Sequence, residues 1–126
     1  MTLFDTVIRV LEEVYIAKNF SYAENHLPEN YVCHFFSGTK NKAEAIALAK
    51  KYAKKHDIKK IYSTVDSSDE ETITLNILLE CQEKEKFLGF TVGENTTVHR
   101  HLKTFKVKNG IITESWDESP ESEYEA

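Results

Sequence analysis

Three side chains that can move protons or bind anions alternate along one stretch of the chain, at His99, His101 and Lys103. Alternate residues of a β-strand point to the same face, so a strand here would place all three together. Histidine titrates near neutral pH, so His101 and His34 could transfer protons, and Glu114 could orient one of them or act as the base. We predict His34, His101 and Glu114 as the catalytic candidates. The competing interpretation is that each histidine is a hydrogen-bonded structural residue on a half-buried strand.

The His99-x-His101 spacing also fits two zinc ligands on one strand face, with His34 as a third. No further cluster of histidine and cysteine along the sequence supports this set. No glycine-rich loop of the kind that cradles phosphate occurs either. We therefore expect neither a metal nor a cofactor.

Aromatic residues gather in the two segments that carry these polar candidates. They could form the apolar wall of a pocket for a flat ligand, or they could be ordinary core residues. Together with two of the polar residues above, they give the predicted ligand-binding set. Its members are Tyr31, Phe36, His99, Lys103, Phe105 and Trp116.

The element that must position most of these residues is a β-hairpin over residues 96–117. Asn109-Gly110 supplies its turn, because a two-residue type I′ loop needs positive φ at both positions. An unbroken register from that turn pairs Val107 with Ile112. Continued outward, it pairs Phe105 with Glu114 and Lys103 with Trp116, all on one face with His101 and His99. That face would be apolar near the turn and polar further out.

The rest of the chain changes from helical to alternating periodicity. We predict helices over 2–18, 20–27 and 41–56, the first capped by Thr2 with Asp5 and the third by Asn41 with Glu44. Strands are expected over 31–36, 58–66 and 71–83, followed by an irregular connection over 84–95 that contains a short strand or bulge around 87–92. Helices followed by antiparallel strands predict an α+β domain with the helices on one face of a curved sheet.

The bulk composition narrows the classes of protein. The chain has 126 residues, 40% of them hydrophobic, and a net charge of -5. It is of single-domain size, and its charge argues against non-specific binding to nucleic acid. We expect one domain over 1–118 and a poorly ordered acidic tail over 119–126. No membrane span or signal peptide is expected, and Cys33 and Cys81 are expected to be buried, reduced thiols of a cytoplasmic protein.

The order of elements and the final hairpin resemble the NTF2-like superfamily, and within it the SnoaL-like group. A second point of resemblance is a histidine shortly before a glycine and the third helix, here His34 and Gly38. The chain departs from cyclase-like members at Lys103 and His101, where they carry an acidic residue. The matching hairpin positions are Phe105, Val107, Asn109, Gly110, Ile112, Glu114 and Trp116.

The resemblance implies an NTF2-like (cystatin-like) cone, in which a curved antiparallel sheet wraps N-terminal helices around a pocket. It also implies a homodimer through the outer face of the sheet. Similar proteins include ketosteroid isomerase-like enzymes, polyketide cyclases and dehydratases, as well as non-catalytic modules. Our leading hypothesis is a pocket for a small organic ligand, used for acid/base isomerisation, cyclisation or dehydration. The alternative is a non-catalytic module for protein interaction or dimerisation.

Overall fold

A computed structural model describes residues 2–36 and 38–118 of the chain, with only the backbone described at 84–86 and 92. The acidic tail predicted over 119–126 lies outside the described residues. Within them, no helix has the length and apolar character needed to cross a membrane.

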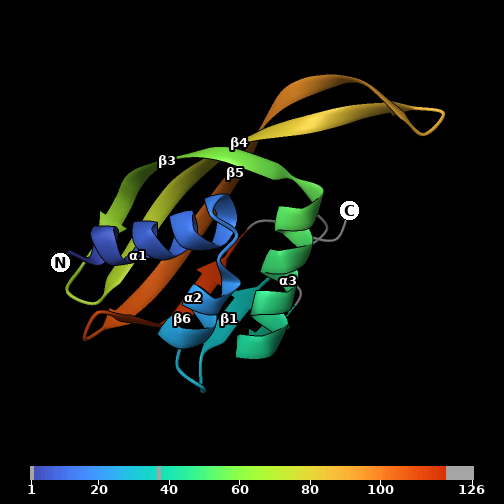
Figure 1. The fold of residues 1–126 in the computed structure, drawn as a ribbon. Helices are drawn as coiled ribbons and strands as arrows, with labels where there is room; N and C mark the ends of the chain where they lie inside the picture. The colour runs from blue at the N-terminus through green and yellow to red at the C-terminus, as the bar shows by residue number, and fades with distance from the viewer. Residues whose placement is uncertain (1, 37, 119–126) are drawn as a thin grey trace.

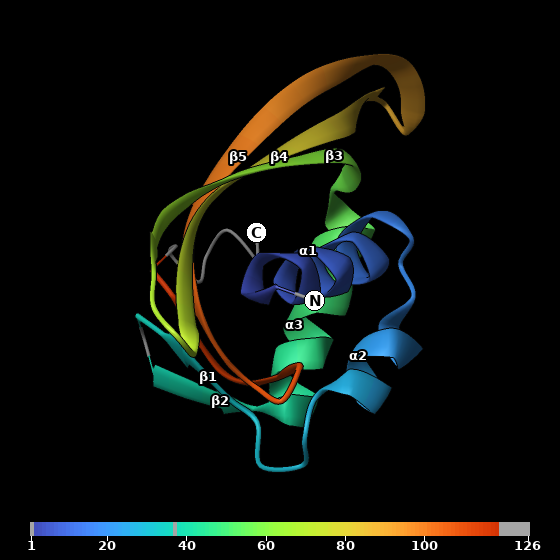
Figure 2. The same cartoon turned by 90° about the vertical axis from the view of Figure 1, so that its left-hand side faces the viewer.

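Six strands of the described chain form one strongly curved sheet in the order β2-β1-β6-β5-β4-β3 (Figure 2). Neighbouring strands are antiparallel, except that β1 runs parallel to β6. The sheet is therefore mixed at this one junction, where an antiparallel sheet was predicted. The strands are β1 (Val32–Phe35), β2 (Gly38–Asn41), β3 (Asp57–Ser68), β4 (Thr72–Phe87), β5 (Phe90–Lys108) and β6 (Ile111–Asp117).

Helices occupy the concave side of the sheet, which we call the inner face (Figures 1 and 2). Thr2 with Asp5, and Asn41 with Glu44, form the predicted capping boxes. The first predicted helix is confirmed but is not uniform, because its second part is a π-helix. The helical segments are α1 (Leu3–Leu11), the π-helix η1 (Glu12–Ile16), α2 (Phe20–His26) and α3 (Lys42–Lys55).

The core lies between the inner face and the first helical segment. Alternate residues of β4 are buried, as its sequence pattern predicted, and they contribute to one apolar cluster with α1 and η1. Cys33 and Cys81 are both buried and free, as expected. Each large apolar side chain buried here contributes roughly 1.5–3 kcal/mol to folding. The buried positions of β4 are Ile73, Leu75, Ile77, Leu79 and Cys81, and those of α1 and η1 include Val7, Val10, Leu11 and Val14.

The segment 84–95 belongs to two paired strands rather than to the irregular connection that was predicted, although the irregularity expected within 87–92 is present as a register shift at Val92. Strands β4 and β5 pair as far as Phe87 and Phe90, with one register shift between Glu85 and Lys86, and Leu88 and Gly89 form the turn with φ of 51° and 83°. Strand β3 pairs with β4 only as far as Gln82, so the remainder projects as a two-stranded arm (Figure 1). The charges and glycines in this segment argued against a strand locally. The arm continues because each strand supplies the other with backbone hydrogen bonds.

The Asn109-Gly110 turn is confirmed, with φ of 52° and 75°. Its first pairs follow the prediction, with Lys108 facing Ile111 and Val107 facing Ile112. Beyond them, the register shifts and Thr113 is the extra residue of a β-bulge.

The bulge changes every further pair of this hairpin. Phe105 faces Ser115 rather than Glu114, and Lys103 faces Asp117 rather than Trp116. The two predicted pairs are wrong because an added residue exchanges the faces of all residues after it. Ser115 and Asp117, both buried, consequently point to the inner face. Glu114 and Trp116 point to the opposite, outer face.

Candidate functional site

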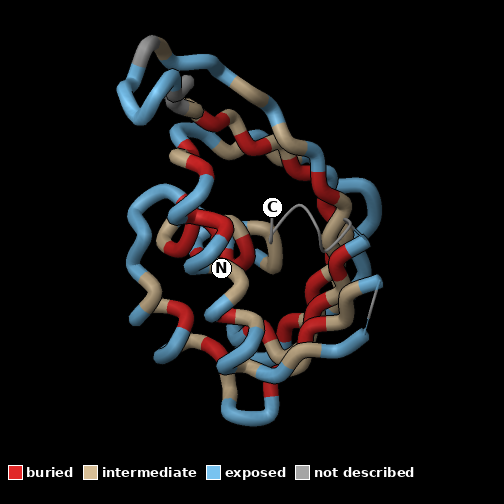
Figure 3. The backbone as a smooth tube through the Cα atoms, turned by 90° about the vertical axis from the view of Figure 1, so that its right-hand side faces the viewer, coloured by how far each residue is buried: buried red, intermediate tan, exposed pale blue. Residues whose placement is uncertain are grey.

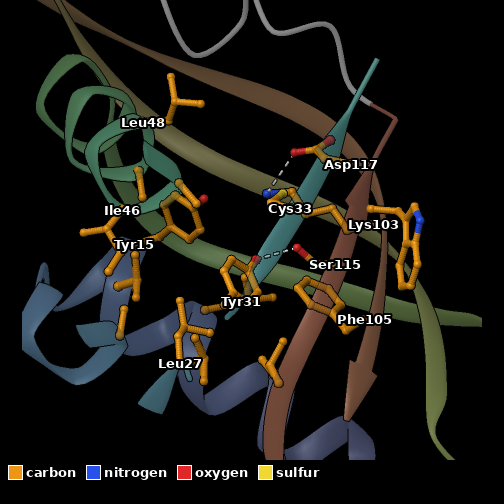
Figure 4. A pocket seen from close by; sticks show the side chains of 18 of the residues that line it. Tyr15, Leu27, Tyr31, Cys33, Ile46, Leu48, Lys103, Phe105, Ser115 and Asp117 are labelled. Carbon is orange, nitrogen blue, oxygen red and sulfur yellow. Dashed lines mark hydrogen bonds and ion pairs between the residues drawn. The ribbon is translucent and has the colours of Figure 1, made fainter. Parts of the chain in front are cut away.

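A cleft of about 100 Å³ lies between the helices and the inner face of β1, β5 and β6 (Figure 4). One end of the cleft is polar, where β1, β5 and β6 meet. The wall from the helices is mostly apolar. That wall includes Val10, Leu11, Val14, Leu27, Ile46 and Leu48.

The polar end contains a buried ion pair that the bulged register creates. Lys103 Nζ lies 3.3 Å from Asp117 Oδ2, and the two side chains are only 12% and 3% exposed. Lys103 Nζ also lies 5.4 Å from the centre of the Tyr15 ring, which gives the ammonium a second favourable contact. Removing two charges from water costs several kcal/mol, so they depend on each other for stability inside the protein.

Two further polar side chains stand beside this pair. The hydroxyls of Tyr31 and Ser115 are hydrogen-bonded at 2.5 Å. Burial raises the pKa of Tyr31 far above its ordinary value, so its hydroxyl keeps its proton. Burial also raises the pKa of the Cys33 thiol, which makes Cys33 a poor nucleophile. The polar end thus offers hydroxyl and ammonium donors and one carboxylate acceptor.

His101 is buried on the inner face of β5, as predicted, but it does not line the cleft as far as the described residues show. Its Nε2 lies 3.3 Å from the Tyr52 hydroxyl. Burial, followed by the nearby Lys103 charge, lowers the pKa of His101 to about 3. The imidazole is therefore neutral at physiological pH.

His34 and Glu114 are brought together, but not in the cleft. His34 Nε2 contacts Glu114 Oε2, and the two side chains are about one-third exposed. The His34 ring stacks on the indole of Trp116 at a centroid distance of 5.2 Å. Each of the three is next to a buried residue of the inner face, namely Cys33, Ser115 or Asp117, so alternation places them on the outer face. The predicted catalytic set of His34, His101 and Glu114 is therefore divided between two faces of the sheet.

The predicted ligand-binding residues also separate into two groups. Tyr31, Lys103, Phe105 and Trp116 are among the residues that line the cleft, although the Trp116 ring stacks on His34 at the outer face. Phe36 is 90% exposed beyond the end of β1, and His99 contacts other residues nearer the arm. Sequence reasoning missed Ser115, Asp117 and Cys33, because their orientation depends on the bulge and on the parallel pairing of β1 with β6.

A second cluster of polar side chains lies under the base of the arm. His56, Cys81 and His99 each offer a ligand atom within 4.8 Å of the others. Glu83 Oε1 lies 2.6 Å from His56 Nδ1 and 3.3 Å from His99 Nε2. Burial raises the pKa of Cys81 to about 11, so its thiol is protonated in this arrangement. The zinc set weighed and set aside in the sequence analysis, His34, His99 and His101, is not brought together, because His34 lies on the outer face.

No protein-family profile and no curated protein matches the chain. Solved structures do match it. A SnoaL-like polyketide cyclase from Agrobacterium tumefaciens is 13% identical with a TM-score of 0.65, over 93% of this chain and 90% of that one. A proposed polyketide cyclase from Acidithiobacillus ferrooxidans is 13% identical with a TM-score of 0.69, over 93% of this chain and 89% of that one. A de novo designed protein with a curved β-sheet is also 13% identical, with a TM-score of 0.64 over 95% and 88%.

The chain therefore has an α+β cone fold of the NTF2-like (cystatin-like) type. Within that class it has the form seen in SnoaL-like proteins, as the final hairpin predicted. At a sequence identity of 13%, the similarity to these structures establishes the fold alone. A de novo designed protein with a curved β-sheet shares this fold at a similar TM-score, so function has to be argued from the cleft itself.

Proposed function

We propose that the cleft binds a small, mostly apolar organic molecule that carries one oxygen function. The observation behind the proposal is the buried Lys103–Asp117 pair at the end of an apolar cleft, with the Tyr31 hydroxyl beside it (Figure 4). Apolar walls with a few convergent polar groups are typical of ligand sites. A carbonyl oxygen could accept hydrogen bonds from Lys103 and Tyr31, and a ligand hydroxyl could donate to Asp117.

The size of the cleft restricts the ligand. A cavity of roughly 150 Å³ accepts one benzene ring, whereas drug-sized ligands occupy roughly 300–1,000 Å³. A cleft of about 100 Å³ that opens to solvent suits a single ring or a short chain. A polycyclic substrate would require the helices to move away from the sheet.

In its enzymatic form, the proposed site performs cofactor-independent acid/base chemistry on such a ligand. Asp117 accepts a proton from the carbon next to a carbonyl, and Lys103 and Tyr31 stabilise the negative charge that develops on the oxygen. In a ligand with a β,γ double bond, return of the proton from Asp117 to the γ-carbon gives isomerisation. In a β-hydroxy carbonyl ligand, the hydroxyl leaves with the proton that Asp117 accepted, so water is released and an α,β double bond forms. His34 and Glu114 take no part in it, because they lie on the outer face.

The test is ligand-observed NMR with benzene, cyclohexanone and phenol as probes. Wild type is expected to bind cyclohexanone and phenol more tightly than benzene. Asp117→Asn keeps the volume of the side chain. It should weaken the binding of phenol at least about tenfold, because the ligand hydroxyl loses its charged acceptor. Glu114→Gln on the outer face is the matched control and should bind as wild type does. Equal affinity of wild type for all three probes would contradict the proposed site, and so would equal affinity of the two variants for phenol.

The second candidate function is a non-catalytic interaction module that forms a homodimer through the outer face. The supporting observation is exposed apolar surface there, with Tyr62 50% and Val98 56% exposed. In sedimentation velocity, wild type would be a dimer and Val98→Glu a monomer, while Glu94→Gln on the arm would not change the assembly. A monomeric wild type at high micromolar concentration would remove this candidate. Free buried thiols at Cys33 and Cys81 support a cytoplasmic location for either function.

A further inference from the structure

The second cluster, at the base of the β4–β5 arm, is independent of the cleft. We propose that His56, Cys81 and His99, with Glu83 as the fourth ligand, bind a zinc ion. The ion would join the end of α3 to the two strands from which the arm projects.

The fold itself brings these ligands together. Cys81 and Glu83 are alternate residues of β4 and therefore share its inner face. On β5, His99 faces Leu79, so it lies diagonally next to Cys81 on the same face. His56 ends α3, immediately before β3, and its backbone N–H is bonded to the Tyr52 carbonyl at 2.9 Å.

The distances are near those that zinc requires. In a tetrahedral site, neighbouring ligand atoms lie about 3.3–3.6 Å apart, given Zn–N bonds of ~2.0–2.1 Å and Zn–S bonds of ~2.3 Å. The ligand atoms of His56, Cys81 and His99 are within 4.8 Å of one another, so small side-chain rotations bring them into range. Both histidine nitrogens already face Glu83 Oε1, at 2.6 and 3.3 Å. A cation between them would replace the protons that these hydrogen bonds share.

The donor set suits zinc better than a hard cation. Imidazole nitrogens and a thiolate are preferred ligands of zinc, whereas calcium and magnesium require oxygen. On binding, the Cys81 thiol gives its proton to solvent, and the thiolate and the Glu83 carboxylate together balance the two charges of the metal. The site needs a net charge near zero because it is removed from water, with Cys81 fully buried and His56 6% exposed. Glu83, with 35% of its side chain exposed, provides the path by which an ion enters.

Zinc in this place would stabilise the arm. Beyond Gln82, no third strand of the described residues pairs with the arm, and an isolated two-stranded hairpin is only marginally stable in water. A metal that ties Cys81, Glu83 and His99 to His56 would fix its base to α3.

The test uses tag-free, chelator-treated protein titrated with ZnCl₂ by calorimetry and with Co²⁺ by absorption spectroscopy. We expect one equivalent of each metal and a thiolate-to-cobalt charge-transfer band. Cys81→Ser should lose the band and at least about tenfold in zinc affinity. Cys33→Ser is the matched control, because Cys33 is the other buried free cysteine, and it should keep both.

If Cys81→Ser does not fold, a second pair of variants tests whether this cluster binds zinc. His99→Gln is the more tolerant change, since the His99 side chain is 24% exposed, and it should also lose at least about tenfold in zinc affinity. His34→Gln, on the outer face, should bind zinc as wild type does. Substoichiometric binding by wild type, or equal binding by His99→Gln and His34→Gln, would show only adventitious metal and overturn the proposal.

Discussion

Two acid–base pairs lie back to back on neighbouring strands of the same sheet. Lys103 and Asp117 face the helices and are 12% and 3% exposed, whereas His34 and Glu114 face outward and are 32% and 33% exposed. Both pairs use an acidic residue of β6, and only Ser115 and Trp116 separate the two acids along the chain. Side-chain alternation assigns them to opposite faces of the strand.

The two pairs differ in their environment more than in their residue types, and the environment determines how much each pair contributes to stability. The inner pair lies in a region of low dielectric constant, where an unmatched charge is costly and proton affinities are easily changed. The outer pair exchanges contacts with water and is weak. The bulge at Thr113 determines which acid becomes the inner one.

The largest expected effect comes from removing one partner of the inner pair. Asp117→Ala leaves the Lys103 ammonium buried without its carboxylate and should lower the free energy of unfolding by about 3–5 kcal/mol. Small domains are stable by only about 5–15 kcal/mol, so a substantial part of the stability would be lost. Equilibrium unfolding in urea at neutral pH measures the change.

The double variant Lys103→Met with Asp117→Leu controls for lost packing. Apolar residues of similar volume should restore most of the stability, because no buried charge remains. If the double variant were as unstable as Asp117→Ala, shape and not charge would explain the loss.

An intermediate effect is expected at His26, which holds β6 at the bulge. The Ile112 N–H donates to His26 Nε2 at 3.0 Å, so His26 must be neutral to accept this bond. His26→Ala should cost about 1–3 kcal/mol, because it leaves a buried backbone donor without its partner. Urea unfolding of wild type and variant at several pH values gives the difference between them.

That difference should depend on pH in one direction. Burial lowers the pKa of His26 in the folded state below its ordinary value of about 6.5. The unfolded chain therefore binds the proton first as the pH falls, and protonation favours unfolding. The stabilisation by His26 should be complete above about pH 6.5 and decline as the pH drops toward the folded-state pKa. A difference that stayed constant, or grew in acid, would contradict this role.

Local signals predicted much of this architecture from the sequence. The capping residues Thr2 and Asn41, the periodicity of β4 and the Asn109-Gly110 turn each depend on nearby residues, and each was confirmed. These signals predicted an α+β domain with helices on one face of a curved sheet, and the resemblance to NTF2-like proteins implied the cone. Tyr31 and Lys103, two of the residues predicted to bind a ligand, lie in the lining of the cleft.

The rest depends on pairing that a local pattern does not encode. Thr113 has no sequence feature that marks a bulge, yet it moves Asp117 inward and Glu114 outward. Likewise, His56 and Cys81 come from different elements, and only the path from α3 into β3 brings them together. The register built from strand alternation alone was therefore correct near the turn, and beyond the bulge it was reversed for the residues of β6.

The smallest effect is expected for the outer pair. A double-mutant cycle of His34→Ala and Glu114→Ala should give a coupling energy of only about 0.2–1 kcal/mol, decreasing in high salt, because water competes for both groups. Trp116 stays in place as a common background, although His34→Ala also removes the stacked ring and costs stability of its own. The cycle cancels that single-variant cost and isolates the pair. A coupling above about 2 kcal/mol would place the outer pair in the energy range of desolvated charges and would argue that a partner covers the outer face.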